Sequence, residues 1–247
     1  MRKRIFCGGV VNCCLVVVFI CVFVVSFVGN TQMVYSNNDN IVVYKGNSQS
    51  AVSLMFNVYW GTEYLCQILE ILDKYQATCT FFVGGTWVAQ HPEMLKLIVD
   101  SGHEIANHGY FHKQHSILNY EQNIQEIDAC SKLVWEHVGV KPSLFAPPSG
   151  DFDNKTVDAC KTLGYKLIMW SKDTIDWRDK DDQVILSRAT KNISAGDLVL
   201  MHPTKYTLLA LEQILQHYKS VGLSVITVSE NIGELCNTSN NTKVDLD

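Results

Sequence analysis

Short apolar segments alternate with amphipathic segments along most of the chain. Apolar stretches bounded by Gly, Pro, Asn or Asp predict strands at residues 51–58, 78–83, 103–106, 143–146, 166–170, 197–202 and 224–228. Apolar positions recur with helical spacing at residues 63–75, 93–101, 120–137, 155–163, 183–192 and 207–221. Repeated strand–helix units predict a mostly parallel sheet with helices packed outside it.

About seven such units fit a closed or nearly closed (β/α) barrel better than two domains. A doubly wound open sheet is the alternative architecture. In both, ligands bind at the carboxyl ends of the strands, so the residues that follow each strand are the candidates for chemistry.

The first part of the chain has a different pattern. An almost unbroken apolar run at residues 5–28 follows Arg2, Lys3 and Arg4. It is longer than the roughly 7–15 apolar residues of a signal peptide and matches the about 20 of a spanning helix. We expect residues 1–29 to be a signal anchor in the cell membrane with the domain outside, or else a cleaved signal peptide. Residues 30–50 are predicted to be a linker, residues 51–233 a domain, and residues 234–247 a disordered tail.

The net charge of −5 provides no basic surface, which argues against nucleic-acid binding. The segment "EIANHGYFHKQH" contains His108 and His112, four positions apart after a predicted strand. On a helical turn both imidazoles would face one side, a spacing suited to one metal ion. His103 is interpreted as structural, and His115 as a solvent residue.

Three other strand ends contain polar or aromatic side chains. "FAPPSGDFD" places Pro147 either in a rigid turn or in the wall of a cleft. "WSKDTIDWRD" places Asp173 and Trp177 four positions apart, so that a carboxylate could orient a histidine beside an indole. "DLVLMHP" ends an apolar strand with Leu200 and His202, and a histidine in that place is a candidate general acid.

In this order, the segments resemble the polysaccharide deacetylases of the NodB-homology type, carbohydrate esterase family four. The resemblance covers residues 51–232, and "WG" and "FAPPSGDF" are similar to its sporulation-associated branch. It implies a distorted (β/α) barrel of about seven strands. It also implies a divalent metal, usually zinc, held by an Asp and two His, with a second Asp as base, an Arg that tethers the base, and an acid His with its own Asp. The implied partner is peptidoglycan or a chitin-like N-acetylglucosamine polymer.

The resemblance transfers to this chain only in part. His108 and His112 match the metal histidines, and His202 matches the acid, with Leu200 before it. Asp173 and Trp177 are also retained. The remaining family positions carry other residues: Asn57 replaces the base, Val58 replaces the metal carboxylate, and Ala146 replaces the Arg.

Two hypotheses follow. The first is a divergent deacetylase, in which Glu63, Asp151 or Asp153 replaces the base. The second is a catalytically silent glycan-binding protein with an aromatic groove. Its predicted substrate-binding residues are Tyr59, Trp60, Trp177, Leu200 and Pro147, with Trp87 as a further candidate. Retention of the histidines favours altered hydrolase activity.

Overall fold

The computed structural model describes residues 41–234. The predicted anchor at residues 1–29 and almost all of the predicted tail therefore lie outside the described residues. Within residues 41–234, no helix is both long enough and apolar enough to cross a lipid bilayer.

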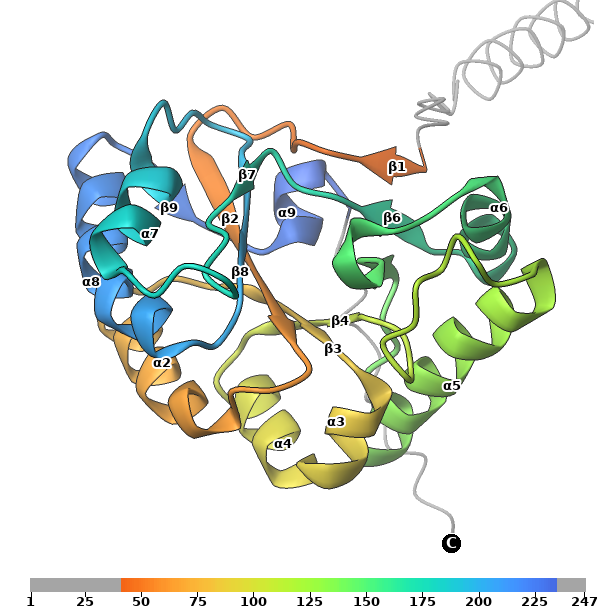
Figure 1. The fold of residues 1–247 in the computed structure, drawn as a ribbon. Helices are drawn as coiled ribbons and strands as arrows, with labels where there is room; N and C mark the ends of the chain where they lie inside the picture. The colour runs from red at the N-terminus through yellow and green to blue at the C-terminus, as the bar shows by residue number, and fades with distance from the viewer. Residues whose placement is uncertain (1–40, 235–247) are drawn as a thin grey trace, which may run out of the picture. The chain divides into compact units, whose positions relative to one another are not determined.

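A single curled, parallel sheet forms the centre of the described region (Figure 1). Its strands pair in the order β1-β6-β5-β4-β3-β2-β8-β7, and β9 pairs with β2. The bounds are β1 Val42–Val43, β2 Ala51–Val58, β3 Thr80–Val83, β4 Glu104–Asn107, β5 Leu144–Phe145, β6 Lys166–Ile168, β7 Lys172–Asp173, β8 Leu198–Met201 and β9 Ser224–Val225. Among the described strands, the two ends of this path, β1 and β7, are not paired with each other. The sheet is therefore a half-barrel and not a closed one.

Helices surround this sheet, as the amphipathic segments predicted. Their bounds are α2 Thr62–Lys74, α3 Gly85–Gln90, α4 Pro92–Asp100, α5 Tyr120–Val138, α6 Asn154–Leu163, α7 Asp182–Thr190, α8 Lys205–Ser220 and α9 Val228–Ile232. In α2 the residues with helical spacing are the buried ones, Leu65, Ile68, Leu69 and Leu72. That face packs on the sheet and keeps the outer face polar.

The central strand β2 is buried along its whole length. Successive side chains of a strand point to opposite faces. Phe56 and Val58 belong to the larger apolar cluster, whereas Met55 belongs to a second cluster on the other face. Asn57 therefore lies on the opposite face from Val58, and this alternation decides which residue reaches the site.

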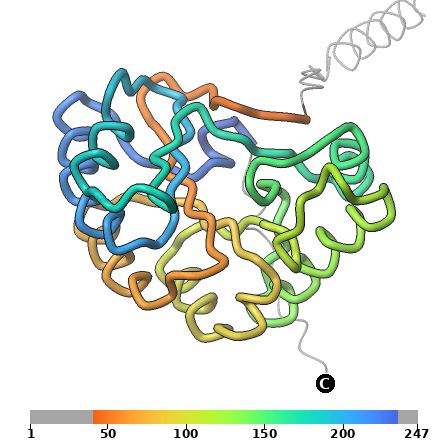
Figure 2. The backbone as a smooth tube through the Cα atoms, viewed as in Figure 1, coloured from red at the N-terminus to blue at the C-terminus, as the bar shows by residue number. Residues whose placement is uncertain are grey.

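The first and last described segments lie side by side, as the backbone path in Figure 2 shows. The main-chain N–H of Asn47 donates to the carbonyl of Asn231 at 2.7 Å, and β9 pairs with β2. These contacts join the two ends of the described region next to the start of β2.

Some elements differ from those predicted. β1 lies in the segment predicted as linker and pairs with β6, and the short strand β7 had not been predicted. The predicted strand at residues 224–228 ends at Val225, because Thr227 and Glu230 form a capping box that starts α9. β1 and β7 are strands through their pairing with β6 and β8, which the local periodicity of the sequence does not report.

Candidate active site

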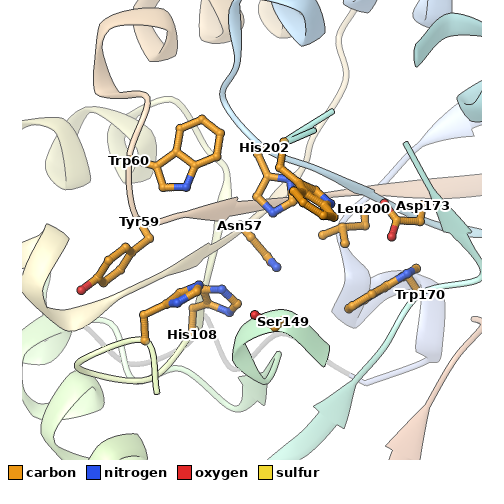
Figure 3. A pocket seen from close by; sticks show the side chains of 11 residues that line it. Asn57, Tyr59, Trp60, His108, Ser149, Trp170, Asp173, Leu200 and His202 are labelled. Atoms are coloured by element: carbon orange, nitrogen blue, oxygen red, sulfur yellow. The ribbon is translucent and has the colours of Figure 1, made fainter. Parts of the chain in front are cut away.

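A pocket of about 460 Å³ lies at the carboxyl ends of the strands (Figure 3). It is lined by Asn57, Tyr59, Trp60, His108, His112, Ser149, Trp170, Asp173, Trp177, Leu200 and His202. Most of these residues are in β2, β7 and β8 or in the connections that follow β2, β4, β5 and β8. The pocket therefore lies at the end of the sheet where the rule for parallel sheets expects a ligand site.

His108 and His112 come together in this pocket, with ring centroids 5.1 Å apart and planes at 69°. The expected helical turn between them was wrong, because residues 108–115 contain no helix. Instead, Gly109 and His112 have left-handed backbone angles, with φ of 75° and 55°. The path of the loop, and not an i,i+4 helical spacing, brings the two rings together.

Hydrogen bonding defines the tautomer of His108. Its Nδ1 lies 2.8 Å from the carbonyl oxygen of Ala146, which can only accept, so Nδ1 carries the proton and Nε2 keeps its lone pair. Burial, followed by the neighbouring His112, holds the pKa of His108 well below its ordinary value. Burial also lowers the pKa of His112. Both rings are therefore neutral near pH 7, which is the form that binds metals.

His202 is held by Asp176 and not by the predicted Asp173. The carboxylate of Asp176 accepts from the main-chain N–H of His202 at 2.6 Å and lies 2.7 Å from its Nδ1. Thr207 donates a third hydrogen bond to the same carboxylate, whose side chain is fully buried. This network orients the ring and leaves Nε2 as the atom available to a ligand.

The register of the sheet explains this correction. β7 pairs with β8 so that Asp173 lies beside Leu200 on the pocket wall. Its Oδ1 accepts from the main-chain N–H of Ile175 at 2.8 Å. Ile175 has a φ of 52°, and the turn that it makes returns the chain so that Asp176 meets His202.

Aromatic side chains form the walls, as predicted for Tyr59, Trp60 and Trp177. Trp60 stacks on His202, with centroids 5.9 Å apart and planes at 2°, and Tyr59 lies 4.7 Å from the ring of His112. Trp60 is 45% exposed and Trp177 is 57% exposed. Exposed indole faces at a pocket mouth are suited to stacking against a flat apolar ligand face.

Other predicted residues lie elsewhere. Pro147 is buried and does not line the pocket, but Ser149, two positions on, does. Trp87 belongs to the core, where its Nε1 donates to Thr62. Trp170 and Ser149 line the pocket without having been predicted, since a strand-end position was their only sequence signal.

Two further histidines complete the comparison. His115 is fully buried and lies 2.6 Å from Asn123, so its interpretation as a solvent residue was wrong. His103 accepts a hydrogen bond from the main-chain N–H of Cys79 at 3.3 Å and does not line the pocket, in agreement with a structural role.

A family model for polysaccharide deacetylases matches residues 44–168. The chain belongs to the polysaccharide deacetylase family. It is 32% identical to a peptidoglycan-N-acetylglucosamine deacetylase of Bacillus cereus, over 74% of this chain and 89% of the relative. It is 38% identical to the YlxY protein of Bacillus subtilis, over 78% of this chain but only 60% of that protein's length.

Among solved structures, a CE4 family pseudoenzyme from Bacillus anthracis superimposes with a TM-score of 0.75 at 35% identity. The match covers 77% of this chain and 68% of that protein. A mutant of that pseudoenzyme with restored enzymatic activity has a similar match. The family to which this chain belongs therefore includes both deacetylases and a pseudoenzyme.

Asp173 is the one carboxylate among the described residues that line this pocket, and the three side chains predicted to replace the base lie elsewhere. Glu63 is exposed in the first turn of α2 and is not a lining residue. The carboxylate of Asp151 accepts from the N–H and hydroxyl of Ser116, and Asp153 is the N-cap of α6. None of the three predicted replacement bases lies on the pocket wall.

The pocket also does not fit the family's metal. Among residues 41–234, no cluster of three or more His, Cys, Asp or Glu is arranged to hold a metal ion. His108 and His112 supply two nitrogens, whereas catalytic zinc usually has three protein ligands. Val58, at the position of the missing carboxylate, is fully buried in the core.

Proposed function

We propose that this chain is a polysaccharide deacetylase-like protein that binds N-acetylglucosamine-containing glycan of the peptidoglycan class in this pocket. We further propose that the missing base reduces the rate of acetyl removal below what an acetate assay measures. One observation carries the proposal: the amide of Asn57, and no carboxylate, occupies the base position beside His108 and His202.

The chemistry of this position explains the reduced rate. An amide has no basic form near neutral pH, so Asn57 cannot take a proton from an attacking water. Loss of a general base typically costs about 10²–10⁴-fold in rate. The shortage of metal ligands affects the same attack by water, so it lowers the rate further than the loss of the base alone.

The rest of the pocket supports binding. Its walls combine exposed indoles with a few buried polar groups, the usual composition of a small-ligand site. The Bacillus cereus relative is named for peptidoglycan N-acetylglucosamine, which motivates the ligand class. We place the protein at the outer cell surface, held by the apolar segment at residues 5–28.

A specific observation favours a second candidate, slow residual deacetylation. The Asp176–His202 pair has the arrangement of an oriented general acid, which a protein that only binds glycan does not need. In this alternative, acetyl removal is slow but depends on His202.

The decisive experiment measures glycan binding and acetate release in parallel. The full-length chain is incubated with N-acetylglucosamine pentamers and with peptidoglycan, with zinc or cobalt added. The same assays are run on Asn57→Asp/Val58→Asp, in which both carboxylates return, and on that variant with His202→Ala added. Thermal melts show that each variant is folded.

We expect the wild-type chain to bind glycan without measurable acetate release, and the double variant to gain release that His202→Ala removes. Acetate released by the wild type and lost on His202→Ala alone supports the second candidate. Failure of the wild type to bind either glycan contradicts the proposal as a whole.

A further inference from the structure

Asn57 has a buried side chain that makes no hydrogen bond to the rest of the described protein. Only 5% of the residue is exposed, and its Oδ1 has no hydrogen-bond partner among the described residues. Figure 3 shows its amide in the middle of the pocket, between His202 and His108. A buried amide without partners costs free energy, and the fold recovers none of it.

The neighbouring groups do not use this amide. His108 donates from Nδ1 to Ala146, and His202 from Nδ1 to Asp176. Phe56 and Val58 face the core on the other side of β2. Because no hydrogen bond from the protein fixes the orientation of the amide, Asn57 can turn either its NH2 donor or its oxygen acceptor toward a ligand.

A second amide is the ligand group that matches such a side chain. An acetamido group has a carbonyl oxygen that accepts and an N–H that donates, and it is neutral. The amine left after deacetylation is a cation with donors only. Asn57 therefore matches the acetamido group in both its donor and its acceptor.

We propose that Asn57 is the residue by which the pocket recognises an intact N-acetyl group, through a hydrogen bond between the two amides. This inference rests on the proposed glycan-binding function. Asn57 at the base position then determines specificity. In contrast to an Asp it cannot act as a base, but it offers both a donor and an acceptor to the unhydrolysed ligand.

The energetic consequence is a preference for acetylated sugar. The ammonium of glucosamine can donate to Oδ1 of Asn57 but offers no acceptor to Nδ2, whereas the acetamido group pairs with both. A site that hydrogen-bonds a ligand group disfavours the analogue that leaves one of its polar atoms unpaired. One such bond corresponds to about tenfold in affinity. We therefore expect the chain to bind acetylated oligomers about tenfold more tightly than deacetylated oligomers of equal length.

The test compares equilibrium binding of N-acetylglucosamine pentamers and glucosamine pentamers to the full-length chain, with chelator present so that no acetyl group is removed. Asn57→Leu keeps the approximate volume but removes both hydrogen-bonding atoms. Asn57→Asp keeps the shape but replaces the donor with a negative charge. Asn154→Leu is the matched control, because it makes the same change at an exposed residue of α6 that does not line the pocket, and circular dichroism confirms folding.

We expect Asn57→Leu to lose the roughly tenfold preference, Asn57→Asp to favour the glucosamine pentamer, and Asn154→Leu to keep the wild-type preference. Equal binding of both pentamers by the wild type, or a preference that survives Asn57→Leu, overturns the inference and leaves the proposed function intact. Binding of neither pentamer overturns both.

Discussion

Asp176 accepts hydrogen bonds from two atoms of His202, the main-chain N–H at 2.6 Å and the ring Nδ1 at 2.7 Å. The pair fixes both the position and the orientation of the imidazole at the end of β8. In the proposed function His202 and Asp176 supply the acid half of the family's chemistry, whereas the amide of Asn57 cannot supply the base half.

Removing the Asp176 carboxylate tests how much it contributes to the stability of the fold. Asp176→Ala leaves the two His202 donors and the Thr207 hydroxyl without their acceptor in a buried place. We expect a loss of about 3 kcal/mol in the free energy of unfolding, measured by urea denaturation. Asp173→Ala is the control, because it removes a half-exposed carboxylate with one main-chain hydrogen bond; an equal loss there contradicts the assignment.

Placing a carboxylate at position 58 tests the link between metal and stability. Val58→Asp introduces a charge into a fully buried apolar position, at a cost of about 3 kcal/mol. Val58 is the last residue of β2, so a small turn of the strand end brings the new carboxylate toward His108 and His112. Zinc at about 100 times its dissociation constant should then return about 2.7 kcal/mol.

Thermal melts with and without zinc measure this effect. Val58→Asp combined with His108→Ala is the control and should gain nothing from zinc. If zinc does not stabilise Val58→Asp, the side chain at position 58 does not reach the histidine pair.

The exposed indoles predict a binding effect without a stability effect. Trp60→Ala and Trp177→Ala each remove a half-exposed ring from the pocket mouth. We expect each to weaken glycan binding about fivefold, which corresponds to about 1 kcal/mol of stacking. Trp135→Ala is the matched control, because Trp135 is 57% exposed on α5 and does not line the pocket. Equal weakening by Trp135→Ala means that the glycan does not bind where we place it.

Stability should fall as the solution is acidified, through histidines. Burial lowers the pKa of His103 from 6.5 to about 4, so the folded state favours the neutral ring. This contribution is fully present above pH 6.5 and is lost as the pH falls through about 4. His108, His112 and His115 act in the same direction, because burial lowers their pKa values too.

Urea titrations at several pH values measure this loss. Burial raises the pKa of Glu104, which acts in the opposite direction, so a single-residue comparison is needed. In His103→Gln the amide oxygen can still accept from Cys79, and the loss between pH 6.5 and 4 should be smaller than in the wild type. An unchanged loss excludes His103 as a contributor.

Sequence reasoning predicted the strand–helix order well, because burial of one face imposes a periodicity that is read locally. It also identified the two positions at the end of the first apolar strand, Asn57 and Val58, where the family resemblance implies carboxylates and this chain has none. It missed β1 and β7, which are strands because they pair with β6 and β8, and local periodicity does not report such pairing.

The sequence by itself therefore determined the family, the edge of the sheet that carries the site, and the loss of the base. The tertiary structure alone decided that Asp176 and not Asp173 holds His202, and that Glu63 is not at the pocket. It also decided that a left-handed loop brings His108 to His112. The physical reason is the distance along the chain between the residues involved. Periodicity is a local property of the sequence, and it reports which face of an element is buried. Strand register and loop paths, set by contacts between residues far apart in the chain, decide which side chains meet.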